Sequence, residues 1–215
     1  MDKKEIIPIC LILFMFILAF YSYPKLPEKV PSHWNSSGEI DNYSNKFVIF
    51  LIPIILLGIY LLFLIIPKIE VFKKNIDEFY KTYMFGFKLV LILFFMALYI
   101  FTLLVTFNYN LKINYFIFPA LGVLFYYIGY MIKNVKRNFF IGIRTPWTLA
   151  NDKVWKKTHE RGSLVFKILG VYTFIFTFFT SKYSFLFFLI PLLILIIYLF
   201  VYSYLIFKKE KVNKL

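Results

Sequence analysis

Cysteine, histidine and acidic residues are rare in this sequence for its length. Its 215 residues include one cysteine, two histidines and 11 aspartates and glutamates. A single cysteine, Cys10, excludes an internal disulfide and a CxxC metal pair. The residues before it, Ile7, Pro8 and Ile9, make a poor lipidation signal. Cys10 is therefore predicted to be a packed apolar thiol rather than a lipid-modified one.

Acidic residues are also missing from the apolar runs, because all of them lie at the termini or in polar segments. Coupled transporters usually keep a charged group at membrane depth, where that costly charge does the work. The absence argues against a pump or coupled carrier and leaves a passive path open. Lys88 is the one ionisable side chain well inside a run, and its long stem can reach the interface.

Catalytic signatures are missing as well. The sequence contains no GxSxG motif, Walker loop or HExxH motif, and no paired carboxylates at membrane depth. It predicts no catalytic residue, no cofactor and no metal, and the protein is not expected to be an enzyme.

Apolar and aromatic residues dominate what is present. Hydrophobic residues make up 61% of the chain, and the mean hydropathy is +0.75. A soluble domain is nearer half apolar. No cleavage site follows the first apolar run, so we expect an uncleaved span. The sequence predicts an all-α, polytopic membrane protein with six transmembrane helices. The expected spans are 6–23, 47–66, 82–107, 115–132, 164–180 and 185–207.

The runs and connectors divide the chain into three parts. An N-terminal two-span region is expected over 1–70, with a polar loop at 24–46. A connector and span three follow over 71–114. The remainder, 115–215, contains spans four to six and the longest polar segment, a motif loop at 133–163.

The distribution of lysine and arginine predicts the orientation. The net charge is +14, and most of the 25 basic residues lie on the side of the termini and the motif loop. By the positive-inside rule, both termini and the motif loop are expected in the cytoplasm and loop 24–46 outside. This clustering at span ends accounts for the charge without direct nucleic-acid binding. The basic residues on the opposite side are Lys25, Lys29, Lys46, Lys112 and Lys182.

The external loop reads PSHWNSSGEIDNYSNK and is rich in turn-forming residues such as Gly38. His33, Asn35, Glu39 and Asp41 could together surround a cation. One imidazole with scattered oxygens is weak support for a metal, however. A structural loop or a partner-binding surface is the preferred interpretation.

Local signals give the motif loop a shape. Pro146 follows Thr145 and predicts a short helical turn, because proline suits a first helical position. Asn151 is the expected N-cap of a second helix over 152–161. Gly162 is the expected helix stop.

On that second helix, Trp155, Thr158 and His159 share one face. Lysines and an arginine cover the rest, so we expect a short amphipathic cytoplasmic helix between spans four and five that lies at the membrane surface. His159 is predicted to be packed and hydrogen-bonded. A membrane enzyme that uses His159 with Arg144 stays a third alternative. The basic residues are Lys153, Lys156, Lys157 and Arg161.

Two segments resemble a known family. Residues 138–162, NFFIGIRTPWTLANDKVWKKTHERG, resemble the signature of the SdpI family of bacterial membrane immunity proteins. The external loop resembles a domain of unknown function that often precedes that signature, with the pattern P-x-H-x-N-x-x-G-x-x-D-x-Y from Pro31 to Tyr43. The chain departs from the signature at Glu160-Arg161, where the family often has arginine, a small or apolar residue and two glycines.

The resemblance implies a protein of the bacterial cell membrane that gives resistance to a secreted peptide toxin. It also implies, for some members, signalling by holding a transcription repressor at the membrane. The expected partners are therefore the lipid bilayer, an external peptide toxin and a cytoplasmic repressor. A small membrane transporter or exporter is the alternative. The matched cytoplasmic residues are Arg144, Thr145, Pro146, Trp147, Asn151, Trp155, Thr158 and His159, and the matched external residues are His33, Asn35, Gly38 and Asp41.

Overall fold

A computed structural model describes residues 3–179 and 183–212. The turn predicted after span five falls largely on residues 180–182, which include Lys182. The end of the basic tail falls on 213–215, and both lie outside the described residues. In chain order the α-helices and strands are α1 (Ile6–Ser22), β1 (Lys29–Trp34), β2 (Ile40–Asn45), α2 (Leu51–Ile69), α3 (Lys73–Phe79), α4 (Phe85–Thr106), α5 (Asn114–Ile132), α6 (Pro146–Ala150), α7 (Asp152–Phe176) and α8 (Ser184–Val212).

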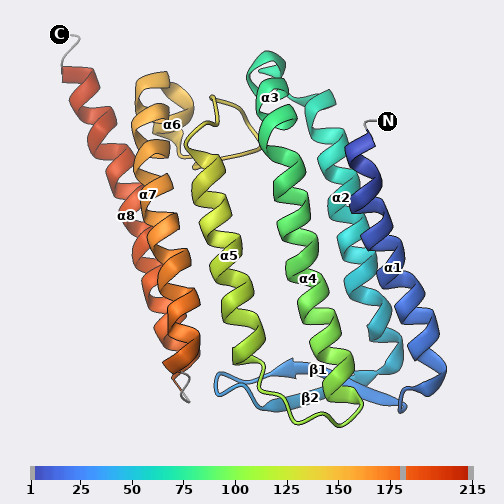
Figure 1. Ribbon diagram of the computed structural model, residues 1–215. Coiled ribbons are helices and arrows are strands. Elements are labelled where there is room, and N and C mark those ends of the chain that lie inside the picture. The colour runs from blue at the N-terminus through green and yellow to red at the C-terminus, as the bar shows by residue number, and fades with distance from the viewer. Residues whose placement is uncertain (1–2, 180–182, 213–215) are drawn as a thin grey trace.

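Long helices stand side by side and form the body of the molecule (Figure 1). Within the described residues, six helical segments are long and apolar enough to cross a membrane. Their outer faces carry exposed apolar side chains, such as Phe20 at 67% and Ile197 at 63% exposure. A bilayer covers such surfaces, and helices satisfy their own backbone polar groups inside it. The prediction of an all-α, multi-pass membrane protein is confirmed.

One end of the bundle carries a feature that the sequence analysis missed. The predicted external loop contains an antiparallel hairpin of β1 and β2, which lies across the ends of the helices (Figure 1). Val30 is fully buried, and the ring of Trp34 lies 5.6 Å from the ring of Phe101 on α4. β2 has no regular alternation of apolar and polar residues, so its pattern did not indicate a strand.

The opposite end holds α3, α6, the motif loop, the start of α1 and the end of α8 (Figure 1). The charged segment expected as a connector up to residue 81 is helical from Lys73 and continues through a π-helical turn, Tyr80–Met84, into α4. Ile76 and Met84 are each 1% exposed. Burial of this apolar side explains why a charged segment forms a helix.

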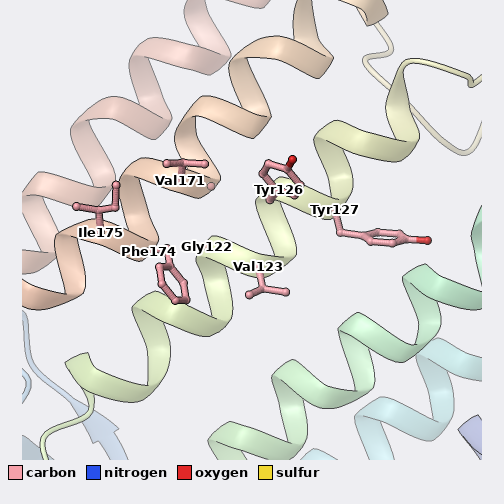
Figure 2. Close-up of a pocket in the computed structure, with 8 residues that line it drawn as sticks. Gly122, Val123, Tyr126, Tyr127, Val171, Phe174 and Ile175 are labelled. Carbon is pink, nitrogen blue, oxygen red and sulfur yellow. The ribbon is translucent and has the colours of Figure 1, made fainter.

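Helices α5 and α7 pack closely because glycines face each other. A Cβ added at Gly170 would lie 2.6 Å from the backbone nitrogen of Tyr126 and 2.7 Å from the carbonyl oxygen of Gly122. Small residues allow this approach in membrane helices. Beside the contact lies an apolar groove of about 260 Å³, which Val123 and Phe174 help to line (Figure 2).

Lys88, near the start of α4, forms a buried ion pair. It is 4% exposed, and its Nζ lies 2.6 Å from Oε1 of Glu5, at the start of α1. The hydroxyl of Tyr60 on α2 donates a hydrogen bond of 2.8 Å to the other carboxylate oxygen of Glu5. The ion pair therefore joins α1 and α4, with α2 supplying the third group.

Candidate functional site: the motif loop and the hairpin

Asn138 organises the first half of the motif loop. Its side chain is 1% exposed and makes four hydrogen bonds to the loop backbone. The amide donates to the carbonyls of Lys136 and Ile141, each at 2.9 Å. The amide oxygen accepts from the backbone of Phe140 at 2.8 Å and of Ile141 at 2.7 Å. A segment without regular structure is thus fixed by one side chain.

The N-terminal half of the chain holds this loop in place. Glu70, which follows α2, is 4% exposed and accepts a 3.0 Å hydrogen bond from the backbone of Phe139. Its other oxygen accepts from the backbone of Phe72 at 2.9 Å. The rings of Phe72 and Phe139 stack, with centroids 5.4 Å apart. Asn75 donates to the carbonyl of Arg137 at 2.8 Å. Sequence reasoning found neither Glu70 nor Asn75, because nothing local links them to the loop.

The predicted turn at Pro146 is confirmed as α6. Thr145 and Thr148 form a reciprocal capping box: each side chain accepts from the other's backbone nitrogen, at 2.9 and 3.2 Å. The hydroxyls of Thr145 and Ser203 on α8 lie 3.0 Å apart. The half-buried Trp147 packs between Phe200 and Tyr204 of the same helix. The signature turn is therefore held against α8.

Asn151 caps α7 as predicted. Its side-chain oxygen accepts from the backbone nitrogens of Lys153 at 2.8 Å and Val154 at 3.2 Å. Arg137 braces the junction, because it forms an ion pair with Asp152 at 2.9 Å and donates to the carbonyl of Leu149 at 2.8 Å. Loop, α6 and α7 are thus connected by side chains on both sides of the cap.

The face predicted to carry Trp155, Thr158 and His159 faces inward, and the three residues are at most 3% exposed. Trp155 donates to the carbonyl of Val135 at 2.7 Å, and its ring stacks on His159 with centroids 4.1 Å apart. The hydroxyl of Thr158 has no hydrogen-bond partner among the described residues. This shared face therefore supports the motif loop and is not a free surface.

His159 is packed and hydrogen-bonded, as predicted. The backbone of Ile143 donates to Nε2 at 3.0 Å, and Nδ1 lies 2.8 Å from the carbonyl of Trp155. This pattern requires a neutral ring with its proton on Nδ1. Gly142 makes room for it: its φ is +122°, and an added Cβ would lie 2.4 Å from Nε2. Both ring nitrogens serve the fold. The exposed Arg144 donates to the carbonyl of Phe139.

The predicted helix stop at Gly162 is wrong. α7 runs through this residue to Phe176, so the first turns and span five are one helix. Gly162 is buried, and an added Cβ would lie 2.4 Å from Cδ1 of Ile143. The glycine therefore allows close packing of the loop, and no separate amphipathic helix lies between spans four and five.

The basic residues of α7 have a partner that sequence reasoning missed. Glu210, near the end of α8, lies 2.6 Å from Lys157 and 3.8 Å from Lys153. Lys156 is exposed. Arg161 donates to the hydroxyl of Tyr198 at 2.5 Å. This surface is thus basic but partly neutralised by one carboxylate.

At the other end, the hairpin separates the four residues predicted to be external into two groups. Nδ1 of His33 lies 2.6 Å from the carboxylate of Asp41 on the facing strand. Asn35 accepts from the backbone of Ser37 at 2.9 Å and of Glu39 at 3.0 Å, which closes the turn. Gly38 has φ +83°, a conformation that suits glycine. These residues build the hairpin and its turn.

Comparisons with known proteins fit this arrangement. Residues 134–203 match the SdpI/YfhL protein family, and residues 10–57 match a domain of unknown function, DUF1648. The chain is 29% identical over 207 residues to the immunity protein SdpI of Bacillus subtilis (strain 168). The aligned region covers 96% of this chain and 97% of that protein. No solved structure matches. The resemblance inferred from the two motif segments is confirmed.

Proposed function

We propose that this SdpI-family membrane protein makes the cell that carries it resistant to a secreted, membrane-active peptide toxin. The observation that carries the proposal is the similarity to an immunity protein along nearly the whole chain, well beyond the two motif segments. The hairpin and the neighbouring helix ends meet the peptide or shield the structure that it attacks.

The proposal includes an orientation. The end with α3, α6 and the motif loop faces the cytoplasm, and the hairpin faces outward. The positive-inside rule supports this, since most basic residues lie at the first of these ends. Cysteines introduced at exposed positions, such as Ser36 in the hairpin turn and Lys156 on α7, test it by labelling from intact cells. Labelling at 156 but not at 36 would reverse the orientation.

The same molecule offers a route for signalling. Glu70 and Asn75 connect the N-terminal half to the motif loop, so a shift of the half that carries the hairpin can be transmitted to the loop.

Exposed lysines on α7 provide a surface suited to an acidic protein face. We extend the proposal to a cytoplasmic repressor held there. The triple change of Lys153, Lys156 and Lys157 to Glu should release such a partner, and co-purification unaffected by it would remove this extension. Lys29→Glu, at the opposite end, is the control.

A small membrane transporter or exporter is the second candidate. The buried Lys88–Glu5 pair favours it, because ionisable groups within membranes often serve ion or proton paths. Both residues, however, lie at the starts of their helices, at one end of the bundle. Transport in vesicles by the wild type that is lost in the Lys88→Met, Glu5→Gln double variant, at an equal amount of folded protein, would favour this candidate.

The direct test uses a Bacillus subtilis strain that lacks its own SdpI. This strain is challenged with the purified secreted peptide that kills it, with and without the protein expressed. We expect a raised inhibitory concentration when the protein is in the membrane. Unchanged killing in cells whose membranes are shown to contain the protein would overturn the proposal for that peptide.

A further inference from the structure

The groove of about 260 Å³ between α5 and α7 exposes only apolar atoms. Gly122 and Gly170 form its floor, where the two helices touch. Val123 and Phe174 stand at its sides (Figure 2). Val123 and Val171 are 50% and 46% exposed, so the groove is open to the bilayer. The apolar ligand that a bilayer supplies to such a surface is an acyl chain.

A lysine lies at the end of the groove nearer the motif loop. Lys167 is one helical turn before Gly170 and Val171 on α7, so it continues the wall of the groove in that direction. A Cβ added at Gly129 of α5 would lie 2.9 Å from Cγ of Lys167, so the stem of the lysine lies against α5. Helical side chains lean toward the N-terminus of their helix, which directs the ammonium group of Lys167 toward the motif-loop end.

The protein does not neutralise the charge of this lysine. Lys167 is partly exposed, and no described residue forms an ion pair or a hydrogen bond with its ammonium group. Lys133, one turn after Gly129, is exposed and equally without a partner in the described part of the chain. Glu160 shares the face of Lys167 but lies two turns away, about 10 Å along α7, beside Lys156. A lysine within a membrane is costly unless it pairs or reaches the interface. The two positive charges therefore favour an anion from outside the chain.

Two tyrosines and the depth of the groove narrow the choice of anion. Tyr126 and Tyr130 share the face of α5 with Lys133 and are 49% and 50% exposed. Within the described chain their hydroxyls have no hydrogen-bond partner, so they can donate to phosphate oxygens alongside the lysines. Along α5, Lys133 and Gly122 lie about 16 Å apart, roughly half of a hydrocarbon core about 30 Å thick. The charged end and the apolar groove together thus match the depth of one leaflet.

We infer that this groove binds an anionic phospholipid from the leaflet at the motif-loop end, with one acyl chain between α5 and α7 and the phosphate against Lys167 and Lys133. Basic sites between transmembrane helices recognise anionic headgroups in this way. A zwitterionic lipid fits less well, because its own cation is repelled by the two lysines. A second copy of the chain also fits less well, because an apolar helix face leaves both lysines unpaired. In the orientation proposed above, the leaflet is the cytoplasmic one. The inference is independent of toxin resistance.

Native mass spectrometry of the protein in detergent tests the headgroup. It compares the binding of phosphatidylglycerol with that of phosphatidylcholine carrying the same acyl chains, at equal amounts of folded protein. We expect the wild type to prefer phosphatidylglycerol. Its affinity should fall about fivefold in Lys167→Met and about twenty-fivefold in the double variant with Lys133→Met. Lys68→Met removes an exposed charge at the end of α2, on the same side of the bundle, and should change little. Equal binding of both lipids by the wild type, or an equal loss in Lys68→Met, would overturn the inference.

Photocrosslinking tests the position of the acyl chain. A benzophenone side chain replaces Val171 in the groove, or Ile168 on the side of α7 that faces α8, in protein reconstituted in vesicles of phosphatidylglycerol and phosphatidylethanolamine. Adducts at 171 should be enriched in phosphatidylglycerol relative to the vesicle and lose that enrichment when Lys167 and Lys133 are both changed to Met. Adducts at 168 should follow the vesicle composition. The same lipid composition at both positions, or adducts at 171 with a second copy of the chain, would refute the site and leave the proposed function standing.

Discussion

A carboxylate oxygen of Glu70 accepts a 3.0 Å hydrogen bond from the backbone nitrogen of Phe139, which lies 69 positions later in the chain. The other oxygen accepts from Phe72. One buried side chain thus satisfies two backbone groups from the two halves of the molecule.

Replacing Glu70 should therefore loosen the motif loop. Glu70→Ala removes the acceptor of two partly buried N–H groups, at a cost of about 1 kcal/mol for each lost bond. Glu70→Gln keeps one acceptor and should cost less. Thermal unfolding in detergent micelles measures this, at about 2–4 °C per kcal/mol for a chain of this size. Glu78→Gln, which breaks an exposed ion pair with Lys136, is the control and should change little. Equal melting temperatures of Glu70→Ala and Glu78→Gln would contradict the role of Glu70 in holding the motif loop.

His159 should act through its hydrogen bonds and not through proton transfer. In His159→Gln, the amide oxygen extends far enough to replace Nε2 as the acceptor for Ile143. In His159→Leu, that backbone nitrogen is left unsatisfied, at a cost of about 1–3 kcal/mol. We expect the melting temperatures to fall in the order wild type, Gln, Leu, with residual protection following the amount of folded protein. A fully folded Gln variant without activity would instead indicate a chemical role for the imidazole.

The contact between α5 and α7 should be sensitive to a single methyl group. In Gly170→Ala the new Cβ meets backbone atoms of α5, which cannot rotate away, so the helices must separate. Overpacking of this kind typically costs about 1–3 kcal/mol. Gly58 on α2 has nothing within 4 Å of an added Cβ, so Gly58→Ala should be neutral or slightly stabilising. Similar thermal stability of the two variants would refute close packing at Gly170.

The Lys88–Glu5 pair should show strong coupling between its members. Lys88→Met leaves the carboxylate of Glu5 without its cation, and such a break costs about 3–5 kcal/mol in buried pairs. The double variant with Glu5→Gln removes both charges and should recover most of that loss. A double-mutant cycle on thermal stability measures the coupling. Additive losses would show that the two groups do not depend on each other.

Local patterns predicted the elements that depend on local physics. Long apolar runs gave the six spans, and Thr145, Pro146 and Asn151 gave the caps, because bilayer thickness and capping act within a few residues. The shared face of Trp155 and His159 followed from helical spacing, but the spacing does not tell what covers it. In the structure, loop residues around Val135 and Ile143 cover this face.

Three of the misses are carboxylates whose partners are distant in sequence. Glu70, Glu210 and Glu5 looked like solvated charges, and each forms its bond with a residue more than 50 positions away. Gly162 carried a stop signal, but the continuous helix buries it against Ile143. β2 lacks the alternation of apolar and polar residues that predicts a strand, and its backbone pairing with β1 stabilises the strand instead.

The continuity of α7 has a mechanical consequence. A helix of 25 residues is a rod of about 37 Å, so its capped head and its far end cannot move independently. The glycine contact with α5 lies partway along this rod. A displacement of the end near Phe176 would therefore be carried along the helix to Trp155, which makes α7 a rigid connection between the two ends of the bundle.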